Sequence, residues 1–225
     1  MEQPSGDRAA KAALRAHVLE RRRHRSAGVR REAQAGLGTH LTRLLAETGA
    51  GDVAGFLPLP DEPPLLPALE DAHRRGRRVW LPVVAPRRTL AWVQWRPGAA
   101  LLDGALPGLR EPAGPRHGLE VFAAVRLLVV PVVAVDRSGV RLGFGGGYYD
   151  RFLEALETAG HRPRTVACCF ADEVLPTGGP GGAPRRGPGR GPHRARHRGT
   201  GPVRLSAPVR APRAGAVERE PASRM

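Results

Sequence analysis

A glycine-rich segment from Arg141 to Leu153 carries the residue types best suited to hold a phosphorylated ligand. It reads RLGFGGGYYDRFL and follows an apolar run and a turn. Four glycines in it permit positive φ and close approach of a ligand to the main chain: Gly143, Gly145, Gly146 and Gly147. Successive backbone N–H groups at the start of a helix form a cradle for phosphate oxygens. The segment lacks the GK[ST] and GxGxxG signatures, so a glycine-rich turn without a ligand is the alternative interpretation.

The residues that follow the glycines add a metal ligand and an aromatic wall. Asp150 lies at the start of the predicted helix, where a carboxylate is well placed to bind Mg²⁺ near phosphates. Tyr148 and Tyr149 are placed to line a pocket, and a role as core aromatics is the alternative. No Ser/His/Asp or Cys/His constellation is visible, so the chemistry implied is ligand positioning rather than nucleophilic catalysis.

Strands that alternate with helices must position these residues. The strongest strand is the apolar run RLLVVPVVAV from Arg126 to Val135, which is typical of a strand buried on both faces of a parallel sheet, with Pro131 marking an end, bulge or edge. Further strands are predicted at 53–59, 79–84, 90–95 and 165–170, and helices at 7–20, from a Ser26 cap through Leu45, at 63–75 and at 151–159. The alternation predicts an α/β fold with a mostly parallel sheet flanked by helices.

Composition excludes several classes of protein. No apolar run approaches the roughly 18 residues that a membrane helix needs, and the charged N-terminus predicts no signal peptide. The only cysteines, Cys168 and Cys169, are adjacent, so we expect neither a disulfide framework nor a zinc site, and a cytoplasmic protein. The net charge of +15 is uneven, because 178–225 holds 11 arginines and two glutamates. The remaining +6 of residues 1–177 is ordinary for an enzyme.

The C-terminal segment 178–225 is rich in Gly, Pro and Arg and has no apolar periodicity. Such a segment cannot bury enough apolar surface to offset its ordering entropy, so we expect it to be disordered and without regular secondary structure. An arginine-rich arm that binds nucleic acid is one alternative. Another is a frameshifted C-terminus, because the chain has no Ile or Asn and a single Lys, which is typical of a GC-rich gene. A frameshift predicts an exposed sheet edge near Thr165–Phe170.

Five elements, taken in order, resemble the 5-formyltetrahydrofolate cyclo-ligase (5,10-methenyltetrahydrofolate synthetase) family. In chain order they are Lys11-Ala-Ala-Leu-Arg15, Phe56-Leu-Pro-Leu followed by Glu62, Leu81-Pro-Val, Glu111-Pro112, and the segment RLGFGGGYYD that begins at Arg141. The resemblance covers about Lys11 to Pro176. It implies an α/β domain at 1–177 with the family's three-layer fold and a separate tail at 178–225.

The resemblance implies a site as well. Lys11, Arg15, Arg141, the four glycines and both tyrosines would bind ATP; Glu62, with Gly146, Gly147, Tyr148 and Tyr149, would bind the folate; and Asp150 would hold Mg²⁺. Lys11 and Arg15 share a helix face at i, i+4 spacing, and an ordinary solvated face is the alternative. The family continues with an element that holds a second acidic metal ligand, whereas this chain runs into GGPGGAPRRGPGRG.

The implied activity is ATP- and Mg²⁺-dependent closure of 5-formyltetrahydrofolate to 5,10-methenyltetrahydrofolate, with release of ADP and phosphate. In the family, ATP phosphorylates the formyl oxygen, N10 attacks the activated carbon and phosphate leaves. The expected partners are these two small molecules, with no membrane and no specific nucleic acid. Two alternatives stay open: a catalytically impaired member of the family, and a nucleic-acid-associated protein that uses its arginine-rich tail.

Overall fold

The computed structural model describes residues 4–106, 108–177 and 204–205. Four α-helices are present in this part of the chain: α1 (Pro4–Arg23), α2 (Ala27–Thr48), α3 (Leu66–Arg74) and α4 (Tyr148–Thr158). Its strands are β1 (Asp52–Ala54), β2 (Val79–Ala85), β3 (Thr89–Trp95), β4 (Leu101–Asp103), β5 (Arg110–Pro112), β6 (Val125–Pro131), β7 (Ala134–Asp136), β8 (Arg141–Leu142), β9 (Arg164–Cys168), β10 (Val174–Leu175) and β11 (Arg204–Leu205). Three 3₁₀ turns accompany them: η1 (Pro86–Arg88), η2 (Leu119–Ala123) and η3 (Ala171–Glu173).

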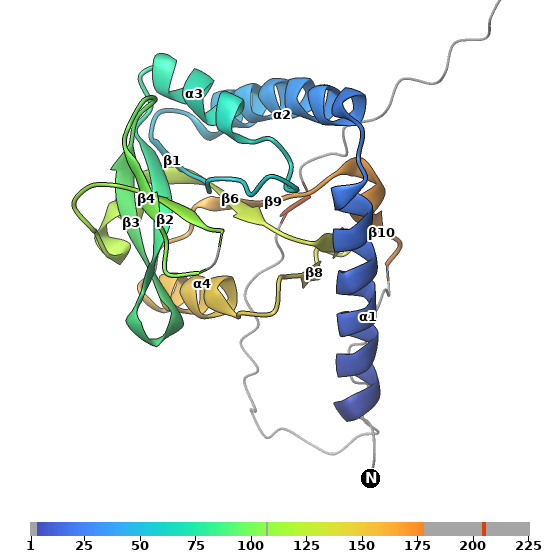
Figure 1. The fold of residues 1–225 in the computed structure, drawn as a ribbon. Coiled ribbons are helices and arrows are strands. Elements are labelled where there is room, and N and C mark those ends of the chain that lie inside the picture. The colour runs from blue at the N-terminus through green and yellow to red at the C-terminus, as the bar shows by residue number, and fades with distance from the viewer. Residues whose placement is uncertain (1–3, 107, 178–203, 206–225) are drawn as a thin grey trace, which may run out of the picture.

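The predicted α/β architecture with a largely parallel sheet is confirmed. The main sheet has the order β11-β9-β6-β1-β2-β3, and every neighbouring pair is parallel except the β2–β3 hairpin. Helices α2 and α3 cover one face and α4 covers the other, as Figure 1 shows. Val121 and Phe122 of η2 pack in the same cluster as α4. Alternate residues of β6 serve the two faces, since Leu127 and Val129 pack toward α2 and α3 whereas Leu128 and Val130 pack toward α4.

Local signals placed most elements within a few residues of their observed bounds. The Ser26 side chain caps α2 by accepting a hydrogen bond from the Val29 N–H, and the leucine stripe of that helix is buried: Leu37, Leu41, Leu44 and Leu45. The predicted strand at 53–59 is much shorter, because β1 ends at Ala54 and only the Gly55 N–H, which donates to the Trp80 carbonyl, continues the pairing with β2. Strand β6 ends at Pro131, so this proline marks a strand end, which is one of the three roles expected for it.

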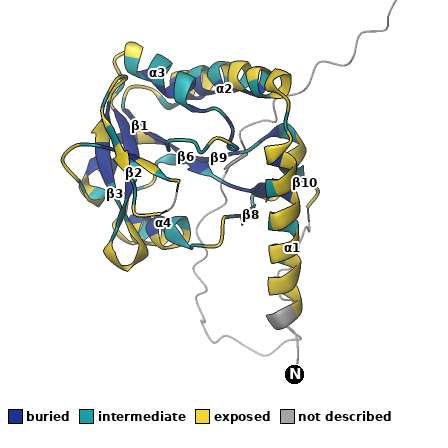
Figure 2. Cartoon of the chain, viewed as in Figure 1, coloured by how far each residue is buried: buried dark blue, intermediate teal, exposed yellow. Residues whose placement is uncertain are grey.

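Helix α1 stands beside the main sheet and packs on a second, small sheet. That sheet has the order β10-β7-β8. Val18 of α1 is buried against Val133, Ala134 and Leu142, while most other residues of the helix are exposed. Figure 2 shows the resulting exposed outer surface of α1. The small sheet ends where the glycine-rich segment begins, so it holds α1 next to that segment.

The prediction for the tail is wrong at two residues. Arg204 and Leu205 form β11, which pairs in parallel with Val166 and Ala167 of β9. The expected exposed edge of β9 is therefore covered at this point, because a strand edge offers unpaired N–H and C=O groups that even a short extended segment can satisfy. The other residues of 178–225 lie outside the described residues, as do the alternatives that concern them.

Candidate functional site

The glycine-rich loop joins β8 to α4 in a conformation that requires its glycines. Gly145 and Gly147 have φ of 100° and 67°, values that other residues rarely adopt. A Cβ added to Gly146 would stand 2.9 Å from the Tyr148 ring. Gly147 is the N-cap of α4 and no side chain caps that helix, so the backbone N–H groups of its first turn are available to an anion.

Helix α1 contacts this loop through Arg15. The Arg15 Nε donates a hydrogen bond of 2.8 Å to the Gly143 carbonyl oxygen. Its guanidinium carbon also lies 3.6 Å from the position that a Cβ on Gly145 would occupy. Lys11, one turn earlier on α1, forms an ion pair of 2.7 Å with Asp7. The structure thus places Arg15 directly on the glycine-rich loop, and Lys11 is held by a partner on its own helix.

Arg141 and Asp150, at the two ends of the loop, form an ion pair. The Arg141 side chain is 11% exposed and that of Asp150 is 75% exposed. Asp150 belongs to the first turn of α4, where the helix dipole favours a negative charge. No group of three or more potential metal ligands occurs in the described part of the chain. One exposed carboxylate fits Mg²⁺ that is bound mainly through phosphate oxygens and water.

Glu62 lies in the segment that follows β1 and is buried. Its Oε2 accepts a hydrogen bond of 2.8 Å from the Leu59 N–H. Burial raises the pKa of Glu62 to about 7, although the Leu59 N–H and the positive charge of Arg22 act in the opposite direction. This carboxyl can therefore change its charge near neutral pH, and it is an acceptor already removed from bulk water.

The two tyrosines at the start of α4 have different surroundings. The Tyr149 hydroxyl is buried and has no hydrogen-bond partner among the described residues. Burial and the negative charge of Glu62 both raise its pKa above the ordinary value. The Tyr149 ring packs edge-on against Phe152, with centroids 6.3 Å apart. Tyr148 instead lies near the Arg151 guanidinium, at 5.8 Å, so Tyr149 is the tyrosine whose hydroxyl faces the interior.

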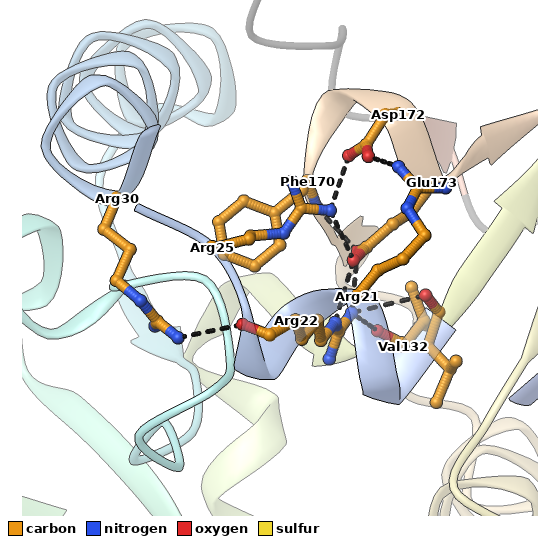
Figure 3. Close-up of polar contacts among 9 residues, drawn as sticks. Arg21, Arg22, Arg25, Arg30, Val132, Phe170, Asp172 and Glu173 are labelled. Carbon is orange, nitrogen blue, oxygen red and sulfur yellow. Dashed lines mark hydrogen bonds and ion pairs between the residues drawn. The ribbon is translucent and has the colours of Figure 1, made fainter. Parts of the chain in front are cut away.

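Sequence reasoning missed a buried ion pair close to these residues. The Arg22 side chain, on α1, is fully buried with Glu173 of η3, and both the Nε and Nη2 atoms bond that carboxylate, at 2.9 and 2.7 Å. Figure 3 shows this pair together with the outer bridges of Arg21 and Arg25 to Asp172. The available signal was the position of Arg22, one turn after Val18 on the apolar stripe of the helix.

Comparisons with known proteins agree on one family. The family model described as the 5-formyltetrahydrofolate cyclo-ligase family matches residues 7–177. A 5-formyltetrahydrofolate cyclo-ligase of Mycolicibacterium smegmatis is 35% identical over 171 residues, which is 73% of this chain and 84% of that protein. One of Escherichia coli is 36% identical over 107 residues, covering 47% of this chain and 58% of that protein.

Two solved structures are similar to this fold. The 5,10-methenyltetrahydrofolate synthetase of Aquifex aeolicus superposes with a TM-score of 0.63 at 26% identity, covering 92% of this chain and 97% of that one. A synthetase of the same name from Mycoplasma pneumoniae has a TM-score of 0.57 at 18% identity, covering 73% and 88% of the two chains, and its likeness concerns the fold alone.

Proposed function

Because this chain belongs to the 5-formyltetrahydrofolate cyclo-ligase family, we propose that it converts 5-formyltetrahydrofolate to 5,10-methenyltetrahydrofolate while ATP becomes ADP and phosphate. The observation that carries the proposal is the hydrogen bond from Arg15 to the Gly143 carbonyl. This contact brings the basic face of α1 onto a loop whose conformation leaves backbone N–H groups free for an anion.

The ATP subsite lies at this junction of α1 and the glycine-rich loop. The loop backbone at Gly143, Gly145, Gly146 and Gly147 would hold phosphate oxygens, with Tyr148 and Tyr149 following it. Arg15 and Arg141 would neutralise phosphate charge, since both lie against the loop in the structure. Lys11 would join them by exchanging Asp7 for a phosphate group, which a flexible, partly exposed ammonium can do.

Asp150 is the proposed ligand of Mg²⁺. Its carboxylate is mostly exposed and stands at the start of α4, beside the proposed phosphate position. Mg²⁺ commonly takes one or two carboxylates together with substrate phosphates. When bound, the ion would neutralise charge on the transferring phosphoryl group. Arg141 would then orient Asp150 through the observed ion pair.

The folate subsite is proposed around Glu62 and Tyr149. The Glu62 carboxylate is a suitable acceptor for the N–H groups of a pterin ring, and its burial strengthens such bonds. The Tyr149 hydroxyl, buried without a partner among the described residues, can bond the same ligand. Gly146, Gly147 and Tyr148 would contact the folate where it meets the ATP phosphates.

The chemistry asks the chain for positioning and electrostatics. The formyl oxygen attacks the γ-phosphorus, the bond from that phosphorus to the bridging oxygen breaks, and ADP leaves. The folate N10 then adds to the activated formyl carbon and loses its proton to the departing phosphate, which leaves with the former formyl oxygen as the methenyl bridge forms. Phosphoryl transfer depends chiefly on alignment and charge neutralisation, which Arg15, Arg141 and the loop N–H groups would supply.

The expected setting is the cytoplasm, with small molecules as partners. No helix in the described part of the chain has both the length and the apolar character to cross a membrane. Residues 1–177 would form the catalytic unit, since the family model ends at residue 177.

Absorbance of the methenyl product tests the function. The purified full chain is mixed with 5-formyltetrahydrofolate, ATP and Mg²⁺, and we expect product only when both ATP and Mg²⁺ are present. Arg15→Met should raise the KM for ATP by about 10- to 100-fold, the usual range for a lost hydrogen bond to a charged group. Arg8→Met is the matched control, because Arg8 is an exposed arginine of the same helix. Turnover without nucleotide would contradict the proposal.

A further inference from the structure

Two buried polar groups, on the helices that contact and follow the glycine-rich loop, have no hydrogen-bond partner within the described residues. They are the Nη1 atom of Arg22 and the hydroxyl of Tyr149. Buried polar groups in folded proteins are nearly always bonded to protein or ordered water, so each orphan requires an explanation. Helix α1 contributes Arg22 and helix α4 contributes Tyr149, which means that no single local turn accounts for both.

The Arg22 guanidinium is fixed so that only Nη1 remains for another molecule. Its Nε and Nη2 atoms bond the two oxygens of Glu173, and Nη2 also donates to the Val132 carbonyl at 2.7 Å. Figure 3 shows these bonds from α1 to Val132, which follows β6, and to η3. A planar guanidinium held along one edge has a fixed direction for its remaining N–H groups.

Arg30 ties the end of α1 to the segment that carries Glu62, because its guanidinium donates to the Arg22 carbonyl at 3.2 Å and to the Asp61 carboxylate at 3.3 Å. The positive charge of Arg22 lowers the pKa of Glu62, and the negative charge of Glu62 raises that of Tyr149. Glu62 uses Oε2 for the Leu59 N–H. The three side chains therefore bring a fixed N–H donor, a carboxylate acceptor and a hydroxyl to one buried region.

We propose that Arg22 is a specificity-determining residue whose Nη1 donates a hydrogen bond to the C4 carbonyl oxygen of the pterin ring. This inference rests on the proposed folate subsite at Glu62. A pterin presents N–H donors at its 2-amino group and N3 beside an acceptor at O4. Glu62 and Arg22 present the complementary acceptor and donors. A 4-amino pterin places N–H donors opposite the donors of Arg22, so the site would reject it.

Phe144 provides the route to this donor. The centre of its ring lies 5.9 Å from the Arg22 guanidinium carbon, and 40% of the residue is exposed. It stands on the glycine-rich loop between Gly143 and Gly145, so the loop that follows β8 brings an exposed ring over the guanidinium. A flat ligand would reach the guanidinium by taking the place of this ring.

The test compares 5-formyltetrahydrofolate with its analogue in which a 4-amino group replaces the 4-oxo group. We expect the wild-type chain to prefer the 4-oxo ligand by about 100-fold in kcat/KM. Arg22→Lys keeps the charge beside Glu173 but loses the fixed fork, and we expect its preference to fall below about tenfold with the KM for ATP unchanged. A structural defect alone would lower both rates without changing their ratio.

Arg25→Lys is the matched control. Arg25 lies three residues away and bonds both Asp172 and Glu173, but it is not among the groups that influence Glu62. We expect this variant to keep the wild-type preference. An unchanged preference in Arg22→Lys, or an equal loss in Arg25→Lys, would overturn the proposal.

Equilibrium dialysis of both ligands separates this inference from the proposed function. If the wild type does not turn over 5-formyltetrahydrofolate, the proposed reaction fails, yet the ratio of the two dissociation constants still tests Arg22. We expect that ratio to be large for the wild type and for Arg25→Lys, and small for Arg22→Lys. Equal ratios in all three proteins would overturn the role of Arg22. An absence of folate binding to the wild type would overturn it as well.

Discussion

Replacing Glu62 by glutamine makes the stability of the protein less dependent on pH. Burial raises the pKa of this carboxyl from its ordinary value of 4.5 to about 7. Glutamine has almost the same shape and keeps an oxygen that can accept the Leu59 N–H, so the substitution removes the titration while preserving the packing.

Proton linkage determines the sign and the size of this change in unfolding free energy with pH. Between pH 4.5 and about 7 the folded chain binds the Glu62 proton more tightly than the unfolded chain does. The free energy of unfolding that the neutral acid contributes is therefore complete below pH 4.5 and is lost as the pH rises through 7. At about 1.4 kcal/mol for each pH unit, the wild type loses roughly 3 kcal/mol relative to Glu62→Gln over this window.

Urea denaturation followed by tryptophan fluorescence measures this difference, because Trp80, Trp92 and Trp95 are buried in the folded state. Unfolding free energies of the wild type and Glu62→Gln would be compared at intervals from pH 5 to pH 8. The exposed Glu154 of α4 provides the control Glu154→Gln, whose stability should follow the wild type. If Glu62→Gln also runs parallel to the wild type across this range, the assigned burial of Glu62 is wrong.

Three further predictions concern α1 and the tail. In steady-state kinetics, Lys11→Ala should raise the KM for ATP by about tenfold and change the KM for the folate little, whereas Asp7→Asn, which keeps the cation, should leave both KM values nearly unchanged. Equal effects of Lys11→Ala on the two KM values would mean that Lys11 does not belong to the ATP subsite. Glu173→Leu should lower the free energy of unfolding by about 3–5 kcal/mol by leaving the Arg22 charge buried and unpaired, and the pair Arg22→Met with Glu173→Leu should recover most of it in urea titrations; no recovery would mean that more than the unpaired charge is lost. A chain that ends at Thr177 lacks β11 and should lose about 1 kcal/mol, the scale of one net hydrogen bond, and a loss several times larger would show that the tail contributes more than this strand.

Local patterns in the sequence determined the elements and the glycine-rich loop. The apolar run through β6 indicated a strand buried on both faces, and the leucines of α2 defined its buried stripe, because period and hydrophobicity are properties of neighbouring residues. The glycines before α4 indicated a loop with positive φ, which Gly145 and Gly147 confirm. The spacing of Lys11 and Arg15 likewise placed both residues on one helix.

Only the tertiary structure decided which of several equivalent side chains are buried and what they meet. Arg21, Arg22 and Arg23 are identical in type and adjacent, and Arg22 alone of the three is fully buried. Its place one turn after Val18 marks the inward face, but only the tertiary structure shows that the buried partner is Glu173, 151 residues away. Likewise, the structure alone shows that Tyr149 has a buried hydroxyl without a partner among the described residues. The pairing of β11 with β9 could not be predicted from the sequence either, because Arg204–Leu205 has no strand pattern of its own. These outcomes depend on contacts between distant segments, and a local pattern carries no information about the partner that supplies the energy of burial.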